Sequence, residues 1–125
     1  MLFDTDVLIW FLRGDEKAAA LLARERDRAM SLVSLMELVQ GARDKREQAV
    51  TRAFLARMDF RILPLTETIG HRALHYLEQH SLKNGIKMPD ALVGATAVEY
   101  KQPLVTANIK HYRVLTGVDI VPFKP

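Results

Sequence analysis

The sequence has no cysteine among its 125 residues, which excludes disulfides, thiolate zinc sites and cysteine nucleophiles. No apolar stretch approaches the roughly 18 residues that a membrane-spanning helix needs. Met1 is followed at once by Leu-Phe-Asp, without the basic segment that opens a secretory signal. Low-complexity segments, long linkers and internal repeats are also missing. We therefore expect a single cytoplasmic domain over residues 1–125.

The excess of positive charge is small. A net charge of +3 and an isoelectric point near 9.4 permit a polyanionic partner such as nucleic acid. Many proteins that bind no nucleic acid have a similar charge, so this signal is weak alone. Most basic residues, such as Arg24, Arg26 and Arg28, alternate with acids and are expected to form a solvated face.

Short apolar runs alternate with helical patterns along the chain. Strands are expected at Met1–Phe3, Met30–Val33, Phe60–Leu63, Pro103–Val105 and Val118–Val121. Helices are expected at Asp6–Leu12, Glu16–Glu25, Ser34–Gly41, Asp44–Met58, Thr66–Leu82, Pro89–Tyr100 and Asn108–Tyr112. Strands separated by helices predict an α/β fold with helices on both faces of a mostly parallel sheet of four to five strands. Ligands bind such sheets outside the carboxyl ends of the strands, so the residues that follow each strand are the site candidates.

Three acids that follow the first two expected strands can each be interpreted in two ways. Asp4 or Asp6 is a favoured residue to cap the helix that follows. Two carboxylates this close together also favour a bound cation. Glu37 stands three residues after Ser34, which is the spacing of a capping box. Because it lies in an otherwise apolar segment, where Glu is rarely buried without a partner, it is equally a candidate to face a metal in the cleft.

Polar residues also follow the later strands or begin later helices. Asp90 follows Pro89 at a helix start, where an acid is favoured by the helix dipole as well as by a cation. Thr106 and Asn108 follow the Pro103–Val105 strand, a position typical of turn and cap residues. Convergent carboxylates would repel one another unless a cation joined them. An all-oxygen donor set favours Mg²⁺ or Mn²⁺ over zinc or copper.

Four segments, in order along nearly the whole chain, resemble the motifs of the PIN-domain family. They are Asp4-Thr5-Asp6-Val7-Leu8, Ser34-Leu-Met-Glu37-Leu-Val-Gln-Gly41, Pro89-Asp90-Ala-Leu-Val-Gly-Ala-Thr-Ala97 and Leu104-Val-Thr-Ala-Asn-Ile-Lys-His-Tyr112. The small size and bare-domain layout look most like its VapC-type ribonuclease toxins, which belong to bacterial toxin–antitoxin pairs. The resemblance implies a PIN-like three-layer α/β/α fold, a metal-dependent endoribonuclease activity, an RNA substrate, a VapB-type antitoxin that blocks the cleft, and a homodimer.

Carried over residue by residue, the resemblance implies that Asp4, Glu37 and Asp90 form the acidic metal cluster. Thr106 and Asn108 would support the cation or position the phosphate. Many family members have a fourth acid in the last motif, near the positions of Asn108 and His111 here, and this sequence has none. Asp6 is the nearest substitute.

Basic residues near the motif ends are the candidates to contact an RNA backbone. They are Arg13, Arg43, Lys87 and Lys110. A further patch on the first helix is apolar and is expected either to pack in the core or to contact an antitoxin or second subunit. It comprises Val7, Leu8, Trp10, Phe11 and Leu12.

Two other functions compete with the nuclease. Leu2-Phe3-Asp4-Thr5-Asp6 resembles the Asp-x-Asp loop of haloacid-dehalogenase phosphotransferases, in which the first Asp is a nucleophile. The expected Gly and Thr after Asp6 are missing, however, and so are paired downstream acids. The second alternative is a PIN-like domain that binds RNA or protein without cutting it, which the missing fourth acid favours.

Overall fold

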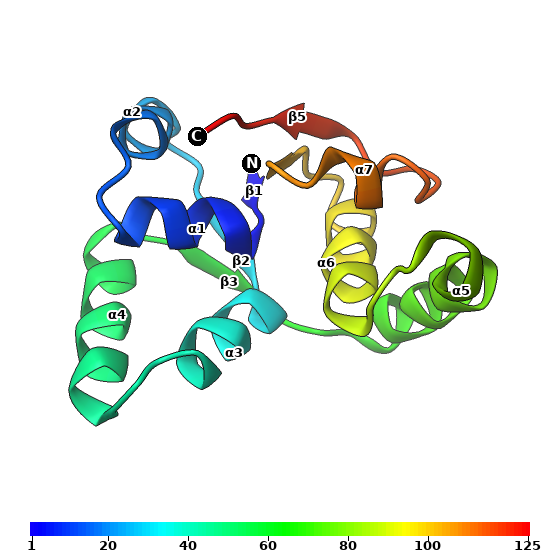
Figure 1. Cartoon of the computed structure of the whole chain (residues 1–125), viewed down its shortest axis with the longest axis horizontal. Helices are drawn as coiled ribbons and strands as arrows, with labels where there is room; N and C mark the ends of the chain where they lie inside the picture. The colour runs from blue at the N-terminus through cyan, green and yellow to red at the C-terminus, as the bar shows by residue number, and fades with distance from the viewer.

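A computed structural model describes residues 1–125, which form five strands with one or two helices between successive strands, seven helices in all (Figure 1). The strands are β1 (Leu2–Phe3), β2 (Ala29–Ser31), β3 (Arg61–Leu63), β4 (Leu104–Thr106) and β5 (Ile120–Pro122). The helices are α1 (Thr5–Leu12), α2 (Glu16–Arg24), α3 (Leu32–Gln40), α4 (Lys45–Arg57), α5 (Glu67–Asn84), α6 (Met88–Glu99) and α7 (Ile109–Tyr112). The expected α/β fold with a parallel sheet of five strands is confirmed.

All strand pairs in the sheet are parallel, in the order β3-β2-β1-β4-β5. The chain builds β2 and β3 on one side of β1, and later places β4 and β5 on the other side. The strand order therefore reverses between β1 and β4. In open α/β sheets this reversal is where ligands bind, at the carboxyl ends of the strands. The register pairs Phe3 with Val105, so the residues that follow these two partners are neighbours at that edge.

Alternate residues of the strands face opposite sides of the sheet, and each side has its own core. Leu2, Ala29 and Leu104 belong to a cluster with buried residues of α5 and α6. Phe3, Met30 and Val105 belong to a second cluster with residues of α1, α2 and α4. Figure 1 shows α5 and α6 on one side of the sheet and α1, α2 and α4 on the other. Period-two burial on both faces is expected of a buried parallel sheet.

Short polar side chains begin most of the helices. Asp15, Asp44 and Thr66 accept hydrogen bonds from backbone N–H groups in the first turns of α2, α4 and α5. These bonds satisfy donors that a helix start leaves free. At the other end of α5, Gly85 adopts a left-handed conformation with φ of 71°, which ends the helix at little steric cost.

The second strand and the helix after it differ from the prediction. The strand expected at Met30–Val33 ends at Ser31, and α3 begins at Leu32. Ser31 accepts from the backbone N–H of Val33 and caps α3. Ser34 is therefore inside the helix, and the capping box with Glu37 is wrong. A mostly apolar segment satisfies strand and helix patterns equally, so its periodicity could not place this boundary.

Arg28 also differs from the prediction of a solvated basic face. Its guanidinium donates to the carbonyl oxygens of Leu22 at 2.7 Å and Met58 at 2.9 Å. It thereby ties the ends of α2 and α4 together, while Arg24 and Arg26 are exposed as expected. No helix of the structure is long and apolar enough to span a membrane.

Candidate active site at the carboxyl edge of the sheet

The site begins where β1 and β4 end. Asp4 follows β1 and caps α1 by accepting from the backbone N–H of Thr5 at 2.8 Å. Thr106, the last residue of β4, lies beside it and donates its hydroxyl to Asp4 Oδ2, also at 2.8 Å. Both residues are buried, and Asp4 is only 5% exposed. Capping and a place in the site were alternative readings for Asp4, and the structure combines them in one residue.

Burial sets the protonation chemistry of Asp4. It raises the pKa of the carboxyl group from 3.8 to about 7, and the negative charges of Asp6 and Asp90 add to the increase. The hydrogen bonds from Thr106 and Thr5 act in the opposite direction. Ionising Asp4 in this buried position costs free energy. A cation bound beside the carboxylate would offset that cost.

Asp6 lies on the first turn of α1 and reaches the β4–α7 connection. Its Oδ2 accepts from the backbone N–H of Ala107 at 3.0 Å and lies 3.5 Å from the Thr106 hydroxyl. Its Oδ1 is buried and has no hydrogen-bond partner. Burial raises the pKa of Asp6 as well, and the charge of Asp90 contributes. An unpartnered buried carboxylate oxygen calls for an explanation, and a bound cation or water would satisfy it.

Asp90 enters the site from the first turn of α6, not as the cap residue, which is Lys87. Its Oδ1 accepts from the Tyr112 hydroxyl at 3.3 Å, and its Oδ2 lies 3.0 Å from Nδ1 of His111. Asn108 Nδ2 lies 2.8 Å from the same ring nitrogen. Two residues of α7 thus contact Asp90, and Asn108 contacts one of them.

Tyr112 joins this group to Asp4. Its hydroxyl lies 3.1 Å from Asp4 Oδ1, so the two acids share one phenol as a neighbour. Tyr112 is fully buried, and burial together with the charges of Asp4 and Asp90 raises its pKa well above 10. The phenol is therefore a neutral hydrogen-bond donor at physiological pH.

Glu37 reaches the site through Thr5. Its Oε1 accepts from the Thr5 hydroxyl at 2.8 Å, and the oxygen of that hydroxyl is 2.9 Å from Ser34 Oγ. Glu37 is only partly buried, and it also lines a cavity of about 670 Å³ between α1, α3 and α4. Arg13 and Arg43, two of the basic residues expected at a cleft rim, line the same cavity.

The five predicted polar groups other than Glu37 thus form one hydrogen-bonded network. They are Asp4, Asp6, Asp90, Thr106 and Asn108. No three Asp, Glu or His side chains stand close enough to share one metal ion as they are placed. The donors are nevertheless all oxygen apart from the imidazole and amide nitrogens around Asp90, and no Lys or Arg forms an ion pair with any of the four acids. This donor chemistry suits Mg²⁺ or Mn²⁺.

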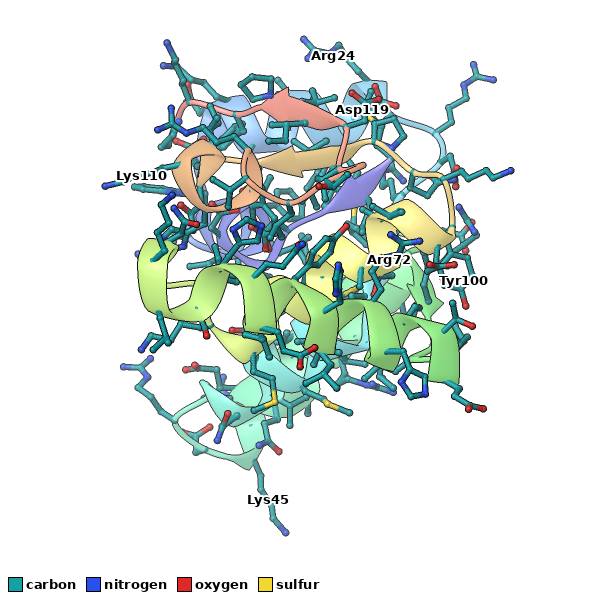
Figure 2. All side chains as sticks on the ribbon, turned by 90° about the vertical axis from the view of Figure 1, so that its right-hand side faces the viewer. Arg24, Lys45, Arg72, Tyr100, Lys110 and Asp119 are labelled. Atoms are coloured by element: carbon teal, nitrogen blue, oxygen red, sulfur yellow. The ribbon has the colours of Figure 1, made fainter.

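The remaining basic and apolar candidates lie around the site. Lys87 and Lys110 are exposed on the two elements that contribute Asp90 and Asn108, and Figure 2 shows Lys110 extending away from α7. The apolar patch on α1 divides in two. Val7 and Leu8 are fully buried in the core, whereas Trp10 and Leu12 are each 37% exposed.

Sequence reasoning missed three residues of the site: Thr5, His111 and Tyr112. All three stand inside the quoted motifs, beside residues that were selected. Acids attract attention because burial makes them costly, whereas a Thr or Tyr in an apolar context gives no such signal. Only the register of β1 with β4 and the short helix α7 bring these hydroxyls to the carboxylates.

Comparison with known proteins identifies the family and supports the fold. The PIN domain family matches residues 1–115. Ribonuclease VapC19 of Mycobacterium tuberculosis is 34% identical over 120 residues, covering 89% of this chain and 90% of that protein. A toxin–antitoxin complex from Klebsiella pneumoniae contains a chain that is 30% identical, with a TM-score of 0.80 and coverage of 99% of this chain and 98% of that one.

A more distant structure supports the fold alone. The DNA-bound VapBC structure from Salmonella typhimurium contains a chain that is 20% identical, with a TM-score of 0.82 and coverage of 97% of this chain and 96% of that one. These matches overturn the phosphotransferase alternative, since a family that spans residues 1–115 leaves no place for a haloacid-dehalogenase fold. The chain belongs to the PIN domain family and is similar to its VapC members.

Proposed function

We propose that this protein is a metal-dependent endoribonuclease and the toxin of a toxin–antitoxin pair. Its similarity to Ribonuclease VapC19 and to the toxin–antitoxin complex from Klebsiella pneumoniae supports the activity and the pairing. The observation that supports it best from this chain alone is the group of one buried and several partly buried acids where the strand order reverses, none of which has a Lys or Arg ion-pair partner.

The proposed cofactor is Mg²⁺ or Mn²⁺. Asp4 and Asp90 would be direct ligands, because they lie on two sides of one phenol hydroxyl at the bottom of the site. Glu37 would be a third ligand or would orient the attacking water, and Asp6 offers its unpartnered Oδ1. When bound, the cation would acidify water and stabilise the charge that develops on the phosphodiester oxygens.

The neighbouring residues would place these acids. Thr106 donates to Asp4 from the end of β4, and Thr5 donates to Glu37 from the start of α1. Asn108 and His111 contact each other beside Asp90. These groups lie at the ends of β1 and β4 and on the helices next to them. Side chains on such rigid elements are positioned more precisely than side chains on loops.

The RNA backbone would run over the basic residues around the acids. Arg13 and Arg43 line the cavity that contains Glu37, and Lys87 and Lys110 are exposed at the start of α6 and on α7. Contacts to phosphates position RNA without reading its sequence. A VapB-type antitoxin would inhibit by covering this cleft, and association of two toxin chains into a homodimer is the proposed oligomeric state.

The test is cleavage of total RNA by the purified, antitoxin-free protein, with Mg²⁺ or Mn²⁺ and with EDTA. We expect discrete fragments that require the metal and disappear with Asp90→Asn, which preserves the shape of the side chain. Asp119→Asn is a matched control, since Asp119 is exposed on the loop before β5. Intact RNA in every lane, with protein shown to be folded, would contradict the proposal.

A non-catalytic RNA- or protein-binding domain is the second candidate. Two observations favour it: the last motif lacks an acid, and no three acids are assembled around one point. It predicts RNA binding without cleavage, with equal affinity in Mg²⁺ and in EDTA. The cleavage assay together with a filter-binding titration separates the two candidates.

A further inference from the structure

Tyr112 is the one side chain that contacts both acids proposed as direct ligands. Its hydroxyl oxygen is 3.1 Å from Asp4 Oδ1 and 3.3 Å from Asp90 Oδ1. Asp4 follows the central strand and Asp90 lies on α6, two elements that are 86 residues apart in the sequence. The phenol is therefore a physical link between two carboxylates that otherwise have separate supports.

The ring that carries this hydroxyl cannot move easily. Tyr112 is fully buried and belongs to the core cluster that contains α5 and α6. A Cβ at Gly94 of α6 would meet Tyr112 Cδ1 at 3.6 Å, so the ring lies directly against the helix backbone one turn beyond Asp90. A rigid ring packed on the helix that carries one acid fixes the distance from that helix to the hydroxyl.

The other oxygens of the two acids are also occupied. Thr106 donates to Asp4 Oδ2, and His111 Nδ1 lies beside Asp90 Oδ2. The Tyr112 hydroxyl lies beside both Oδ1 atoms and, because it has a single hydrogen, donates to one of them at a time. Two like-charged groups repel, and a neutral donor between them lowers the cost of keeping them close before any cation arrives.

We infer that Tyr112 is a positioning residue of the cation site: its hydroxyl sets the separation and orientation of Asp4 and Asp90 for a divalent ion. The inference rests on the proposed function, because it assigns these two acids as ligands. Its consequence is an effect on metal affinity that exceeds any effect on the fold. Outer partners of metal ligands commonly change metal affinity by about 10–100-fold when they are removed.

The test is the affinity of the protein for Mn²⁺, measured by the electron paramagnetic resonance signal of the free ion, without RNA. Tyr112→Phe removes the hydroxyl and retains the packed ring. We expect it to bind Mn²⁺ about 10-fold more weakly than the wild type. The rise in melting temperature that Mn²⁺ produces should shrink accordingly, since stabilisation by a ligand follows its affinity.

Tyr76→Phe is the matched control. Tyr76 is the other fully buried tyrosine, and its hydroxyl donates to the Thr116 carbonyl oxygen, away from the acids. This variant should lose stability in EDTA yet bind Mn²⁺ like the wild type. If Tyr112→Phe behaves as Tyr76→Phe does, with lower stability and unchanged Mn²⁺ affinity, Tyr112 is a structural residue only and the inference is wrong.

A measurement on the wild-type ring covers the case in which Tyr112→Phe does not fold. Tyrosine ultraviolet absorbance reports the hydrogen bonding of the phenol, and the chain has three tyrosines. Mg²⁺ should produce a difference spectrum that persists in Tyr76→Phe and in Tyr100→Phe. Saturable Mn²⁺ binding with no tyrosine difference spectrum would overturn the role of Tyr112 while leaving the nuclease intact. Absence of Mn²⁺ binding by the wild type would overturn the cation site and the role together.

Discussion

Acids at the carboxyl edge of the sheet differ from three acids elsewhere that form ion pairs with arginines. Asp27 pairs with Arg61 at 2.8 Å, Glu47 with Arg43 at 3.0 Å and Glu99 with Arg72 at 2.6 Å, all of them at least partly exposed. Figure 2 shows Arg72 on the side of the molecule covered by α5.

The four acids of the site have hydroxyls, backbone amides and one imidazole as hydrogen-bond partners, and none of them forms an ion pair with a Lys or Arg. Asp4 is the most buried of them and has the strongest reason to be paired. Exposed ion pairs contribute only about 0–1 kcal/mol each to stability. A cluster of acids that includes a buried carboxylate costs stability without a cation, and such clusters are frequent at functional sites.

The largest expected effect follows from removing the charge of Asp4, the most buried of the four acids. Asp4→Asn keeps the size of the side chain and should reduce RNA cleavage by about 100-fold or more, as removal of a group that acts on the transition state commonly does. Asp27→Asn breaks the exposed pair with Arg61 and should leave cleavage unchanged. Cleavage rates of a labelled RNA measure both variants, and equal activity of Asp4→Asn and wild type would remove Asp4 from the mechanism.

A smaller effect is expected from removing the Thr106 hydroxyl, which donates to Asp4 Oδ2. Thr106→Val keeps the shape but leaves Asp4 Oδ2 without its donor and the backbone N–H of Asn108 without its acceptor. An unsatisfied buried polar group costs about 1–3 kcal/mol, and the free energy of unfolding should fall by about that amount. Thr106→Ser should recover most of the loss. Urea denaturation measures the series, and a neutral Thr106→Val would show that water replaces the hydroxyl.

A third expected effect is graded with pH. The pKa of Asp4 is about 7 in the folded protein and 3.8 in the unfolded chain, so the folded state binds the proton more tightly. This contribution to stability is complete below about pH 4 and is lost as the pH rises through about 7. The metal-free protein should therefore become less stable between about pH 5 and pH 8, and Asp4→Asn should flatten the profile. Melting temperatures in EDTA test this, and a stability that rises over that interval would contradict the assignment.

The carboxyl edge was predictable from the sequence to a large degree. Asp4 stands directly after β1, Asp90 in the first turn of α6 and Thr106 at the last position of β4, and a parallel sheet brings such positions to one edge. The starts of α2, α4 and α5 were also predictable, because Asp15, Asp44 or Thr66 stands directly before a segment with helical periodicity.

Two kinds of feature could not be predicted. The change from β2 to α3 occurs inside an apolar run, where only tertiary packing decides between strand and helix, so Ser34 was misplaced as a cap. The contacts of Thr5 and Tyr112 depend on side chains that are far apart in the sequence, and no local pattern carries that information.

Titration of the protein with Mn²⁺ by calorimetry near pH 7.5 tests the central claim most directly, with Asp90→Asn and Asp27→Asn in parallel. The four acids of the site are predicted to bind the cation. Wild type and Asp27→Asn should therefore bind Mn²⁺ with the same affinity, and Asp90→Asn should bind it far more weakly. Equal binding by all three proteins, or no saturable binding by the wild type, would contradict that claim.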